Sequence, residues 1–521
     1  MSSFDVKKSR LGRLVACVAV VILLAAGCGG GGGSSDDGGG GGGEPSADQT
    51  LRVGMGFVSS NLDPISTTAI TDYTYLRLIY DTLVSVDSGS PEPWAAESFE
   101  ALDPQHWRFV LKEGITFSNG EPLDAEAVRY TFQRALDDPA TPWRVRIASV
   151  ERMEVVDDLT IDFFLSSPVG NFPTRTSVVW LVPPVYGATP DALVTEPIGT
   201  GPFTVSDFSP GEKLTLSGNP DYWGNPPELE TVEFTAIPEE STRASALSAG
   251  DIDVAHRILP DFVDQIESAG AAVVSVPSAL SANIFFQSSV ADSPLADVRV
   301  RQAIDYAIDK EALTDAVTQG YGGPLHGQIV GEDSVGFNDD LEQRPYDPDM
   351  ARELLEEAGY GDGLEIAFDY PLGRYFRDKE TAEAVSAYLG EVGITVTQNP
   401  MEGGAWLDRL YTGSWGPLNY WSIQDAPAYD VSWTLEIFLS NNIRKITNDP
   451  EFDAMLAESF TITDQDERDE FLQEVSAYVF EQTFFVTFHH DPGIYAVSPN
   501  VEGIEFLPST YINLFDTQMV D

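Results

Sequence analysis

Residues 197–254 decide the fold, and they read PIGTGPFTVSDFSPGEKLTLSGNPDYWGNPPELETVEFTAIPEESTRASALSAGDIDV. Three runs in this stretch alternate polar and apolar residues, and one repeats small apolar residues at helical spacing: 203–208, 213–217, 231–237 and 240–249. The alternation predicts half-buried strands, and the helical spacing, which Gly250 is suited to end, predicts a helix. A Pro-Gly turn between the first two runs predicts a hairpin. A hairpin followed by a strand-helix-strand unit predicts an α/β domain.

Three motifs in this stretch are more specific than its periodicity. They are GTGPF at 199–203, NPDYWG at 219–224 and LSAGDID at 247–253. Their order and spacing closely resemble the family 5 extracellular solute-binding proteins, which are the peptide, dipeptide and nickel receptors of ABC importers. Residues 298–310, VRVRQAIDYAIDK, resemble another signature of that family. The resemblance implies an α/β, two-lobed fold like that of the type II periplasmic binding proteins, with an extra inserted subdomain and a hinge between the lobes.

The resemblance and the local patterns together predict how the chain divides. A chain of 521 residues is long enough for two or more lobes. A hairpin pattern around Asp157 and Asp158 predicts a self-contained insert in the first lobe. A strand-helix-strand alternation across residues 364–398 predicts a largely parallel sheet in the second. We therefore expect a signal peptide at 1–27, a tether at 28–48, lobe I at 49–89, 198–281 and 491–521, its inserted subdomain at 90–197, and lobe II at 282–490.

The N-terminus has the pattern of an export signal. Four basic residues precede an apolar run, residues 14–26, that is too short to span a bilayer comfortably. The run ends in small residues directly before Cys28, which resembles a bacterial lipoprotein signal with cleavage before Cys28 and lipid on its sulfur. The alternative is an ordinary signal peptide with an incidental cysteine. Residues 29–43 are nearly all glycine and predict a flexible tether, so we expect an exported protein anchored to the outer face of the cell membrane.

The net charge, the motifs that are missing and the placement of the histidines argue against several classes of function. The chain carries 83 acidic and 29 basic residues, a net charge of −54, which would repel the phosphate backbone of a nucleic acid. It contains no GxxxxGK phosphate-binding loop, no GxSxG nucleophile elbow and no HExxH zinc motif. Only His489 and His490 among the five histidines are neighbours, and adjacent residues of a strand point to opposite faces, so they are poorly placed to share a metal. We expect a protein that is not an enzyme and that holds no metal or cofactor.

An aromatic cluster lies within residues 402–433, where we expect loops that line the cleft. Its aromatic residues are Trp406, Tyr411, Trp415, Tyr420, Trp421, Tyr429 and Trp433. In the resembled family, a carboxylate on the corresponding loop binds the α-ammonium group of a peptide. The resemblance implies this role for Asp425 first and for Asp430 second, although QDAPAYD stands here in place of the family's usual Pro-Asp-Pro-like sequence. The alternative for the tryptophans is burial in the core.

Further cleft residues are expected from both lobes. Arg374 could hold a carboxylate in a bidentate grip, or form a surface salt bridge instead. Trp415, Tyr420 and Trp421 would form an aromatic wall of the cleft. Asn61 and Thr200, two polar residues on turns, would face the cleft from lobe I. The complete set of expected ligand-binding residues is Asp425, Asp430, Arg374, Trp415, Tyr420, Trp421, Asn61 and Thr200.

The resemblance implies a monomeric receptor that captures a solute between its lobes and delivers it to an ABC permease with separate ATPase subunits. A peptide is the first expectation for the solute, and an oligosaccharide on the same scaffold is the alternative. Rivals from another class are an anchored hydrolase and a structural surface lipoprotein. A receptor predicts stoichiometric heat and a ligand-dependent rise in melting temperature without any product, whereas a hydrolase predicts turnover.

Overall fold

The computed structural model of the protein describes residues 44–66, 72–87, 89–189, 191–323 and 326–521. The predicted signal peptide, the predicted lipidation site Cys28 and the tether as far as residue 43 lie outside these ranges. Within the described part of the chain, every helix is too short or too polar to cross a membrane.

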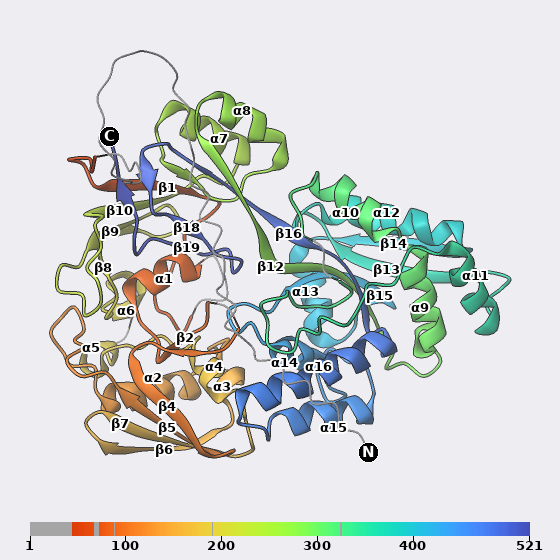
Figure 1. Ribbon diagram of the computed structural model, residues 1–521, viewed down its shortest axis with the longest axis horizontal. Coiled ribbons are helices and arrows are strands. Elements are labelled where there is room, and N and C mark those ends of the chain that lie inside the picture. The colour runs from red at the N-terminus through yellow and green to blue at the C-terminus, as the bar shows by residue number, and fades with distance from the viewer. Residues whose placement is uncertain (1–43, 67–71, 88, 190, 324–325) are drawn as a thin grey trace, which may run out of the picture. The chain divides into compact units, whose positions relative to one another are not determined.

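A sheet of ten strands organises the fold (Figure 1). Its strands lie in the order β14-β13-β15-β12-β16-β11-β1-β10-β9-β8. In chain order their bounds are β1 Thr50–Met55, β8 Phe203–Ser209, β9 Lys213–Gly218, β10 Thr231–Ala236, β11 Val254–Ala255, β12 Ala272–Phe286, β13 Leu364–Pro371, β14 Ile394–Met401, β15 Leu418–Gln424 and β16 Phe485–Val497. The central pair, β12 and β16, has β11, β1, β10, β9 and β8 on one side, here called the first half-sheet. It has β15, β13 and β14 on the other, here called the second half-sheet.

The two central strands belong to both half-sheets, and we call them the crossing strands. β12 is 15 residues long and β16 is 13, and they pair antiparallel along two stretches. The register shifts between these stretches, directly after the pair formed by Pro277 and Pro492. Outside this pairing, β12 also pairs with β15 and β16 with β11. The crossing strands therefore join the two half-sheets into one sheet, although their own ladder is interrupted after the proline pair.

The stretch 197–254 folds as its periodicity predicts. β8 and β9 form a hairpin, β9 pairs antiparallel with β10, and β10 lies parallel to β1. Helix α7, Glu240–Ala249, follows and ends at Gly250, which has a φ of 77° and caps the helix by donating its N–H to the Ala246 and Leu247 carbonyls. β11 then returns parallel to β1. The prediction of an α/β domain is confirmed.

The GTGPF motif has a steric reason in this fold. A Cβ on Gly199 would lie 1.9 Å from the Ile79 carbonyl oxygen, and one on Gly201 would lie 2.5 Å from that of Leu78. Both carbonyls belong to the end of helix α1, Tyr73–Ile79. The turn before β8 can pack against this helix only because two glycines leave room for its backbone.

A separate four-stranded antiparallel sheet lies within residues 96–165, in the order β4-β5-β7-β6. Its strands are β4 Ala96–Asp103, β5 His106–Leu111, β6 Val150–Asp157 and β7 Thr160–Leu165. The hairpin predicted around Asp157 and Asp158 is the turn between β6 and β7. Two-stranded sheets pair β2 Val84–Ser85 with β3 Glu92–Pro93, β17 Val501–Glu502 with β20 Gln518–Met519, and β18 Glu505–Phe506 with β19 Ile512–Asn513. The lobe boundaries given above remain a prediction.

The remaining helices cover the sheets and connect their strands. They are α2 Ala125–Asp137, α3 Arg144–Ile147, α4 Phe172–Thr176, α5 Pro184–Gly187, α6 Ala192–Thr195, α8 Val263–Ser268, α9 Val298–Ala307, α10 Lys310–Thr318, α11 Pro348–Glu357, α12 Asp378–Glu391, α13 Gly403–Thr412, α14 Val431–Leu435, α15 Pro450–Ser459 and α16 Gln465–Gln482. Short 3-10 turns lie at Pro260–Phe262, Pro294–Ala296 and Glu436–Phe438. The stretch 402–433 thus contains α13, β15 and α14, not mainly the loops that we expect from its composition.

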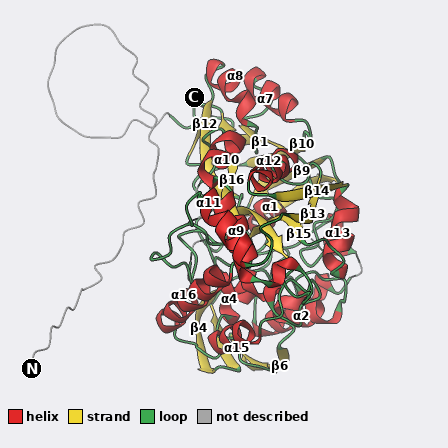
Figure 2. Ribbon diagram, turned by 90° about the vertical axis from the view of Figure 1, so that its right-hand side faces the viewer, coloured by secondary structure: helices red, strands yellow, loops and turns green. Residues whose placement is uncertain are grey.

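Separate hydrophobic cores form on the two sides of the crossing strands. The largest core contains residues of β1, β9 and β10 together with the four-stranded sheet. Another contains residues of β13, β14 and helices α9 to α12. Figure 2 shows these helices beside the strands of the second half-sheet. The sheet is continuous, whereas the apolar packing is divided among several separate cores.

Candidate ligand-binding site

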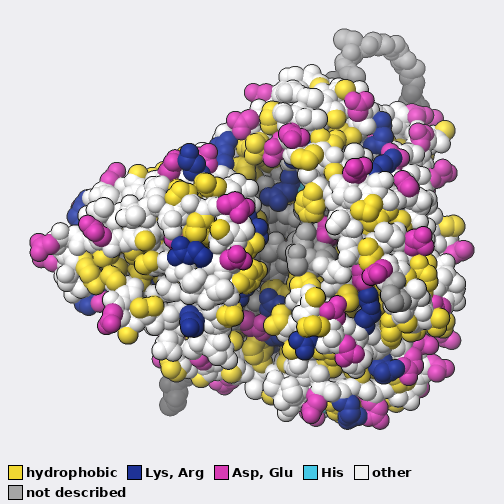
Figure 3. Space-filling model, turned by 180° about the vertical axis from the view of Figure 1, so that it is seen from behind, with side chains coloured by type: hydrophobic (Ala, Val, Ile, Leu, Met, Phe, Trp, Pro, Cys, Tyr) yellow, Lys and Arg dark blue, Asp and Glu magenta, His cyan; other side chains and the backbone are white. Residues whose placement is uncertain are grey.

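A cavity of about 450 Å³ lies beside the crossing strands, with walls from both half-sheets. We call it the arginine cavity. The first half-sheet contributes residues 55–57, at the end of β1, and 256–259, directly after β11, together with the start of α7. The second contributes the loop 373–377 between β13 and α12, and β16 contributes Pro492. Figure 3 shows the surface hollowed, with Lys and Arg side chains visible inside the hollow.

The carboxyl ends of parallel strands explain the first wall of this cavity. β1 and β11 are parallel neighbours, so the chain leaves both at the same edge of the sheet. Loops at this edge are where ligands of open α/β sheets bind. Arg257 therefore reaches the cavity because it follows the last residues of β11.

Four arginines line the arginine cavity, and two of them are fixed by the protein itself. Arg243 is 3% exposed and donates to the backbone carbonyls of Ile237, Pro238 and Arg257. Arg377 donates to the Asp261 carboxylate at 3.0 Å and to the Val317 carbonyl at 3.1 Å. These two side chains hold the walls of the cavity together, and the Arg377–Asp261 ion pair joins its two sides.

The other two arginines have no carboxylate partner in the described part of the chain. Arg374, predicted to bind a carboxylate, is exposed on the cavity wall and its Nε donates to the Tyr375 hydroxyl at 3.3 Å. Its guanidinium also lies 5.4 Å from the Tyr375 ring centre and 5.8 Å from that of Trp406. Arg257 is half-buried on the opposite wall. Both side chains can offer free N–H donors to a ligand.

A second cavity of about 280 Å³ contains Asp425 and is acidic. Glu332 and Asp333 also line it, together with Ser334 and the first part of β12. Asp425 is 1% exposed; its Oδ2 accepts a hydrogen bond from the Ser334 hydroxyl, and its Oδ1 has no well-formed hydrogen bond to any described residue. Burial raises the pKa of Asp425 to about 6, against the lowering effect of the Ser334 hydroxyl. We call this the Asp425 cavity.

The two cavities are neighbours on the crossing strands. Pro277 of β12 lines the Asp425 cavity, Pro492 of β16 lines the arginine cavity, and these two prolines are paired in the ladder. A basic site and an acidic site therefore adjoin each other at the place where the half-sheets meet. Such a pair is chemically suited to a solute with a cationic group at one end and an anionic group at the other.

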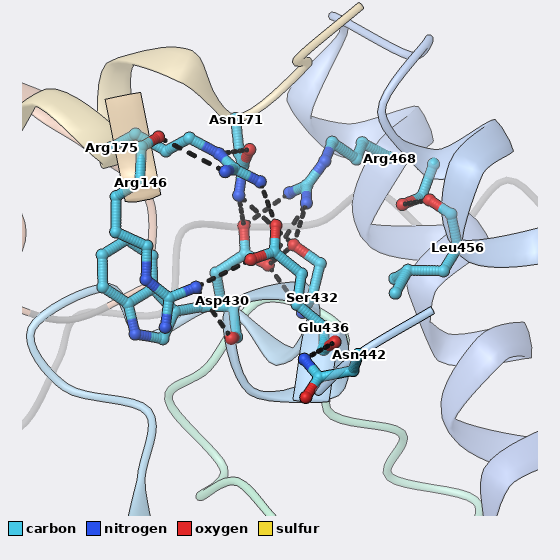
Figure 4. A network of polar contacts seen from close by, with 11 residues as sticks. Arg146, Asn171, Arg175, Asp430, Ser432, Glu436, Asn442, Leu456 and Arg468 are labelled. Carbon is cyan, nitrogen blue, oxygen red and sulfur yellow. Dashed lines mark hydrogen bonds and ion pairs between the residues drawn. The ribbon is translucent and has the colours of Figure 1, made fainter. Parts of the chain in front are cut away.

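Asp430, the second predicted carboxylate, already has ion-pair and hydrogen-bond partners within the protein (Figure 4). It is 1% exposed, and Arg468 donates to its two oxygens at 2.7 and 3.2 Å. Burial acts to raise the pKa of Asp430, but the Arg468 guanidinium and the Ser432 hydrogen bonds hold it below its usual value. Asn171 adds a donor at 3.4 Å. Asp425 thus keeps one carboxylate oxygen that no side chain engages, whereas both oxygens of Asp430 accept hydrogen bonds from Arg468.

The three predicted wall aromatics occupy different environments. Trp415 is buried and donates its indole N–H to the Arg444 carbonyl at 2.8 Å, and Tyr420 is fully buried. Trp421 is half-buried, with its ring centre 5.1 Å from that of Phe285 and 5.4 Å from the Arg444 guanidinium. Trp421 is the most exposed of these three, and none of the three is among the residues that line the arginine cavity or the Asp425 cavity.

The two residues predicted from lobe I lie outside the linings of both cavities. Asn61 is half-buried and its Oδ1 accepts the Asp63 N–H at 2.8 Å, as in a local turn. Thr200 is 1% exposed within the GTGPF turn.

The sequence analysis missed Arg257 and Ser334 as candidate site residues. Only Arg257 had a feature in the sequence that could have identified it, namely its position just after a strand. Within the described residues, no group of three or more His, Cys, Asp or Glu could hold a metal ion.

Comparisons with known proteins agree with one another. The family model described as bacterial extracellular solute-binding proteins, family 5 middle, matches residues 90–444, which include Arg257, Arg374 and Asp425. Heme-binding protein A of Haemophilus influenzae is 27% identical over 479 residues, which cover 83% of this chain and 85% of that protein. The dipeptide-binding protein of Pseudomonas aeruginosa is 25% identical over 492 residues, which cover 86% of this chain and 91% of that protein.

Solved structures share the fold. The crystal structure of the ABC transporter substrate-binding protein CtaP of Listeria monocytogenes matches with a TM-score of 0.81 at 20% identity. The match covers 91% of this chain and 99% of that one. At this identity the likeness concerns the arrangement of the lobes, not the identity of the ligand.

Proposed function

The chain belongs to the bacterial extracellular solute-binding proteins of family 5, and on that basis we propose that it captures a peptide between its lobes and delivers it to an ABC permease. Membership makes it a two-lobed solute-binding receptor of the ABC importer type that works outside the cytoplasm, and not an enzyme. The finer proposal covers the peptide, the monomeric state, delivery to the permease and lipid anchoring through Cys28.

Loss of the protein from the membrane fraction after Cys28→Ala would support the lipid anchor, and unchanged membrane association would refute it.

The observation that carries the peptide proposal is the pairing of opposite charges at the junction of the half-sheets. The Asp425 carboxylate is buried with one oxygen that no side chain engages, and Arg374 lines the adjoining cavity without an acidic partner for its side chain among the described residues. Burying an uncompensated charge is unfavourable, so a closed receptor needs a solute that supplies both countercharges. A free peptide has an ammonium group and a carboxylate, whereas a neutral oligosaccharide has neither.

In this proposal each predicted residue has a distinct role. Asp425 accepts a hydrogen bond from the α-ammonium group through its Oδ1, while Ser334 fixes the orientation of the carboxylate. Arg374 donates two parallel hydrogen bonds to the terminal carboxylate. Asp430 holds the end of the Asp425 loop through Arg468. Main-chain hydrogen bonds to the peptide would supply the remaining affinity.

Calorimetry with short peptides on the wild-type protein and on Asp425→Asn tests the proposal. We expect the substitution to weaken binding by about 10- to 100-fold, because a hydrogen bond to a charged group is worth about 1.5–3 kcal/mol. N-acetylation of the peptide should weaken wild-type binding similarly and should cause little further loss in Asp425→Asn. Binding should raise the melting temperature without releasing any product.

Two results would contradict this proposal. If Asp425→Asn bound free and acetylated peptides as tightly as the wild type does, Asp425 would not be the ammonium site. If oligosaccharides but no peptides produced heat and a shift in melting temperature, the receptor role would stand and the peptide assignment would be wrong.

A further inference from the structure

The arginine cavity carries a local charge opposite to that of the whole chain. Its lining contains Arg243, Arg257, Arg374 and Arg377 and one acidic residue, Glu240, which leaves a formal excess of three positive charges. The complete chain has only 29 basic residues and a net charge of −54. A basic concavity on an otherwise acidic protein concentrates anions there and repels them elsewhere.

The two arginines without a carboxylate partner line this cavity from different half-sheets. Arg257 follows β11 of the first half-sheet, and Arg374 follows β13 of the second. Among the described residues, no side-chain hydrogen bond or ion pair engages the Arg257 guanidinium, whereas Arg243 and Arg377 donate to fixed carbonyls and to Asp261. The cavity therefore has two separate sets of unused guanidinium donors, one on each wall.

The backbone of Arg257 is consistent with a ligand-binding role. Its φ is +50°, in the left-handed region that residues with a side chain rarely adopt. Such conformations cluster at ligand-binding sites, where the surrounding structure holds them in place. Here the Arg257 carbonyl is held by Arg243 at 2.7 Å, so the strained backbone is fixed while the side chain remains available.

One acidic group whose pKa responds to the charge of Arg257 is Asp491, on β16. Its carboxyl is fully buried and lies beyond ion-pair distance of Arg257, since no salt bridge joins them. Burial also raises the pKa of Asp491 to about 7, so part of the population is neutral at that pH. Asp491 therefore does not satisfy the donors of Arg257.

We propose that the arginine cavity binds a solute end that carries two carboxylates, with Arg374 holding one and Arg257 the other. One carboxylate is fully matched by one bidentate guanidinium, so two guanidiniums on opposite walls call for two anionic groups. The volume of about 450 Å³ leaves room for the side chain that separates them. This inference rests on the proposed function, because it assumes that the solute enters this cleft.

The same chemistry could come from a peptide that ends in glutamate or from a small free dicarboxylate. Calorimetry with the tripeptides Ala-Ala-Glu and Ala-Ala-Gln, and with glutarate, distinguishes these sources. The two tripeptides have nearly the same shape and differ by one charge. We expect the wild-type protein to bind Ala-Ala-Glu about tenfold or more tightly than Ala-Ala-Gln, because one charged hydrogen-bonding pair is lost with the glutamine.

Variants then assign the preference to a residue. Arg257→Gln should bind both tripeptides with the affinity that the wild type has for Ala-Ala-Gln, whereas Arg374→Gln should weaken the binding of both. Arg352→Gln is the matched control, because Arg352 is an exposed arginine on α11 that does not line the cavity, and it should keep the full preference. Unliganded melting temperatures close to that of the wild type would show that each variant is folded.

Each outcome decides between the two proposals. Equal wild-type affinity for the two tripeptides, or a preference that survives in Arg257→Gln, would overturn the dicarboxylate inference and leave peptide binding intact. Binding of glutarate but of neither tripeptide, with loss in Arg257→Gln, would support the inference and overturn the peptide assignment. Absence of binding for all three probes would overturn the inference.

Discussion

Asp491 is the residue whose burial has the clearest energetic consequence. It lies on a crossing strand with 0% exposure, and neither carboxylate oxygen has a well-formed hydrogen bond to the described residues. Burial raises its pKa to about 7, and Arg257 lowers it only in part. An unfolded aspartate has a pKa of about 3.9, so the folded protein retains a proton that the unfolded chain releases above about pH 4. Its stabilising contribution is complete below that pH and is lost as the pH rises through about 7.

We therefore predict that Asp491→Asn stabilises the protein at pH 8 and not at pH 4. The expected gain at pH 8 is on the order of 2–4 kcal/mol, since each unit of pKa shift corresponds to about 1.4 kcal/mol. Urea unfolding at pH 4, 6 and 8 measures it, with the exposed Asp339→Asn as the control. A stability difference that does not change with pH would show that Asp491 is not held neutral by burial.

Gly199 offers a second test at the residue scale. A methyl group there would meet the Ile79 carbonyl oxygen at 1.9 Å, so Gly199→Ala should displace the turn from α1 and destabilise the protein by several kcal/mol. At Gly211 a methyl group meets nothing within 4 Å, and only the φ of +78° opposes it. Gly211→Ala should therefore cost about 1 kcal/mol. Equal losses in thermal unfolding would show that backbone conformation, not close packing, explains the GTGPF motif.

At the scale of elements, the network of Figure 4 joins three parts of the chain that are distant in sequence. Asp430 begins α14, Arg468 lies on α16, and Asn171 with Arg175 lies at the start of and within α4. Arg146 and Arg175 both reach Glu436, the former at 2.8 Å. These contacts fix the far end of the segment that carries Asp425, so the position of Asp425 depends on helices outside the cleft.

Breaking the central ion pair of this network should be costly. Arg468→Met leaves the Asp430 carboxylate buried without its main partner, which typically costs about 3–5 kcal/mol. The double variant Arg468→Met with Asp430→Asn should recover part of that loss, because the unpaired charge is removed. Urea unfolding of the two single variants and the double variant measures the coupling. Strictly additive losses would mean that the pair makes no specific contribution.

At the scale of the whole molecule, local sequence patterns predicted the helices and strands better than the contacts between distant parts of the chain. The hairpin of β8 and β9, helix α7 and its glycine cap follow from patterns a few residues long. The pairing of Pro277 with Pro492, and the approach of Arg257 and Arg374 to one cavity, depend on residues more than one hundred positions apart. Periodicity carries no information about such distances, so Arg374 was proposed only from the chemistry of its guanidinium group, and Arg257 was missed.

The two lobes should move when solute binds. A ligand that contacts both walls of the arginine cavity favours a closed arrangement, because it binds that arrangement more tightly than an open one. We predict that the radius of gyration from small-angle scattering falls on saturation with a bound peptide in the wild type. In Arg374→Gln the fall should require a higher peptide concentration. A scattering curve unchanged at full occupancy would contradict a hinged mechanism.

The proline pair in the crossing strands has a consequence for how that motion is possible. Directly beyond this pair the register shifts, and residues 278–280 of β12 have no partner in β16. Proline has no N–H, so neither residue of the pair could extend the ladder into this gap by donating a backbone hydrogen bond. The interruption lies next to both charged cavities. A rotation of one half-sheet against the other would therefore meet the fewest interstrand bonds where the solute is expected to bind.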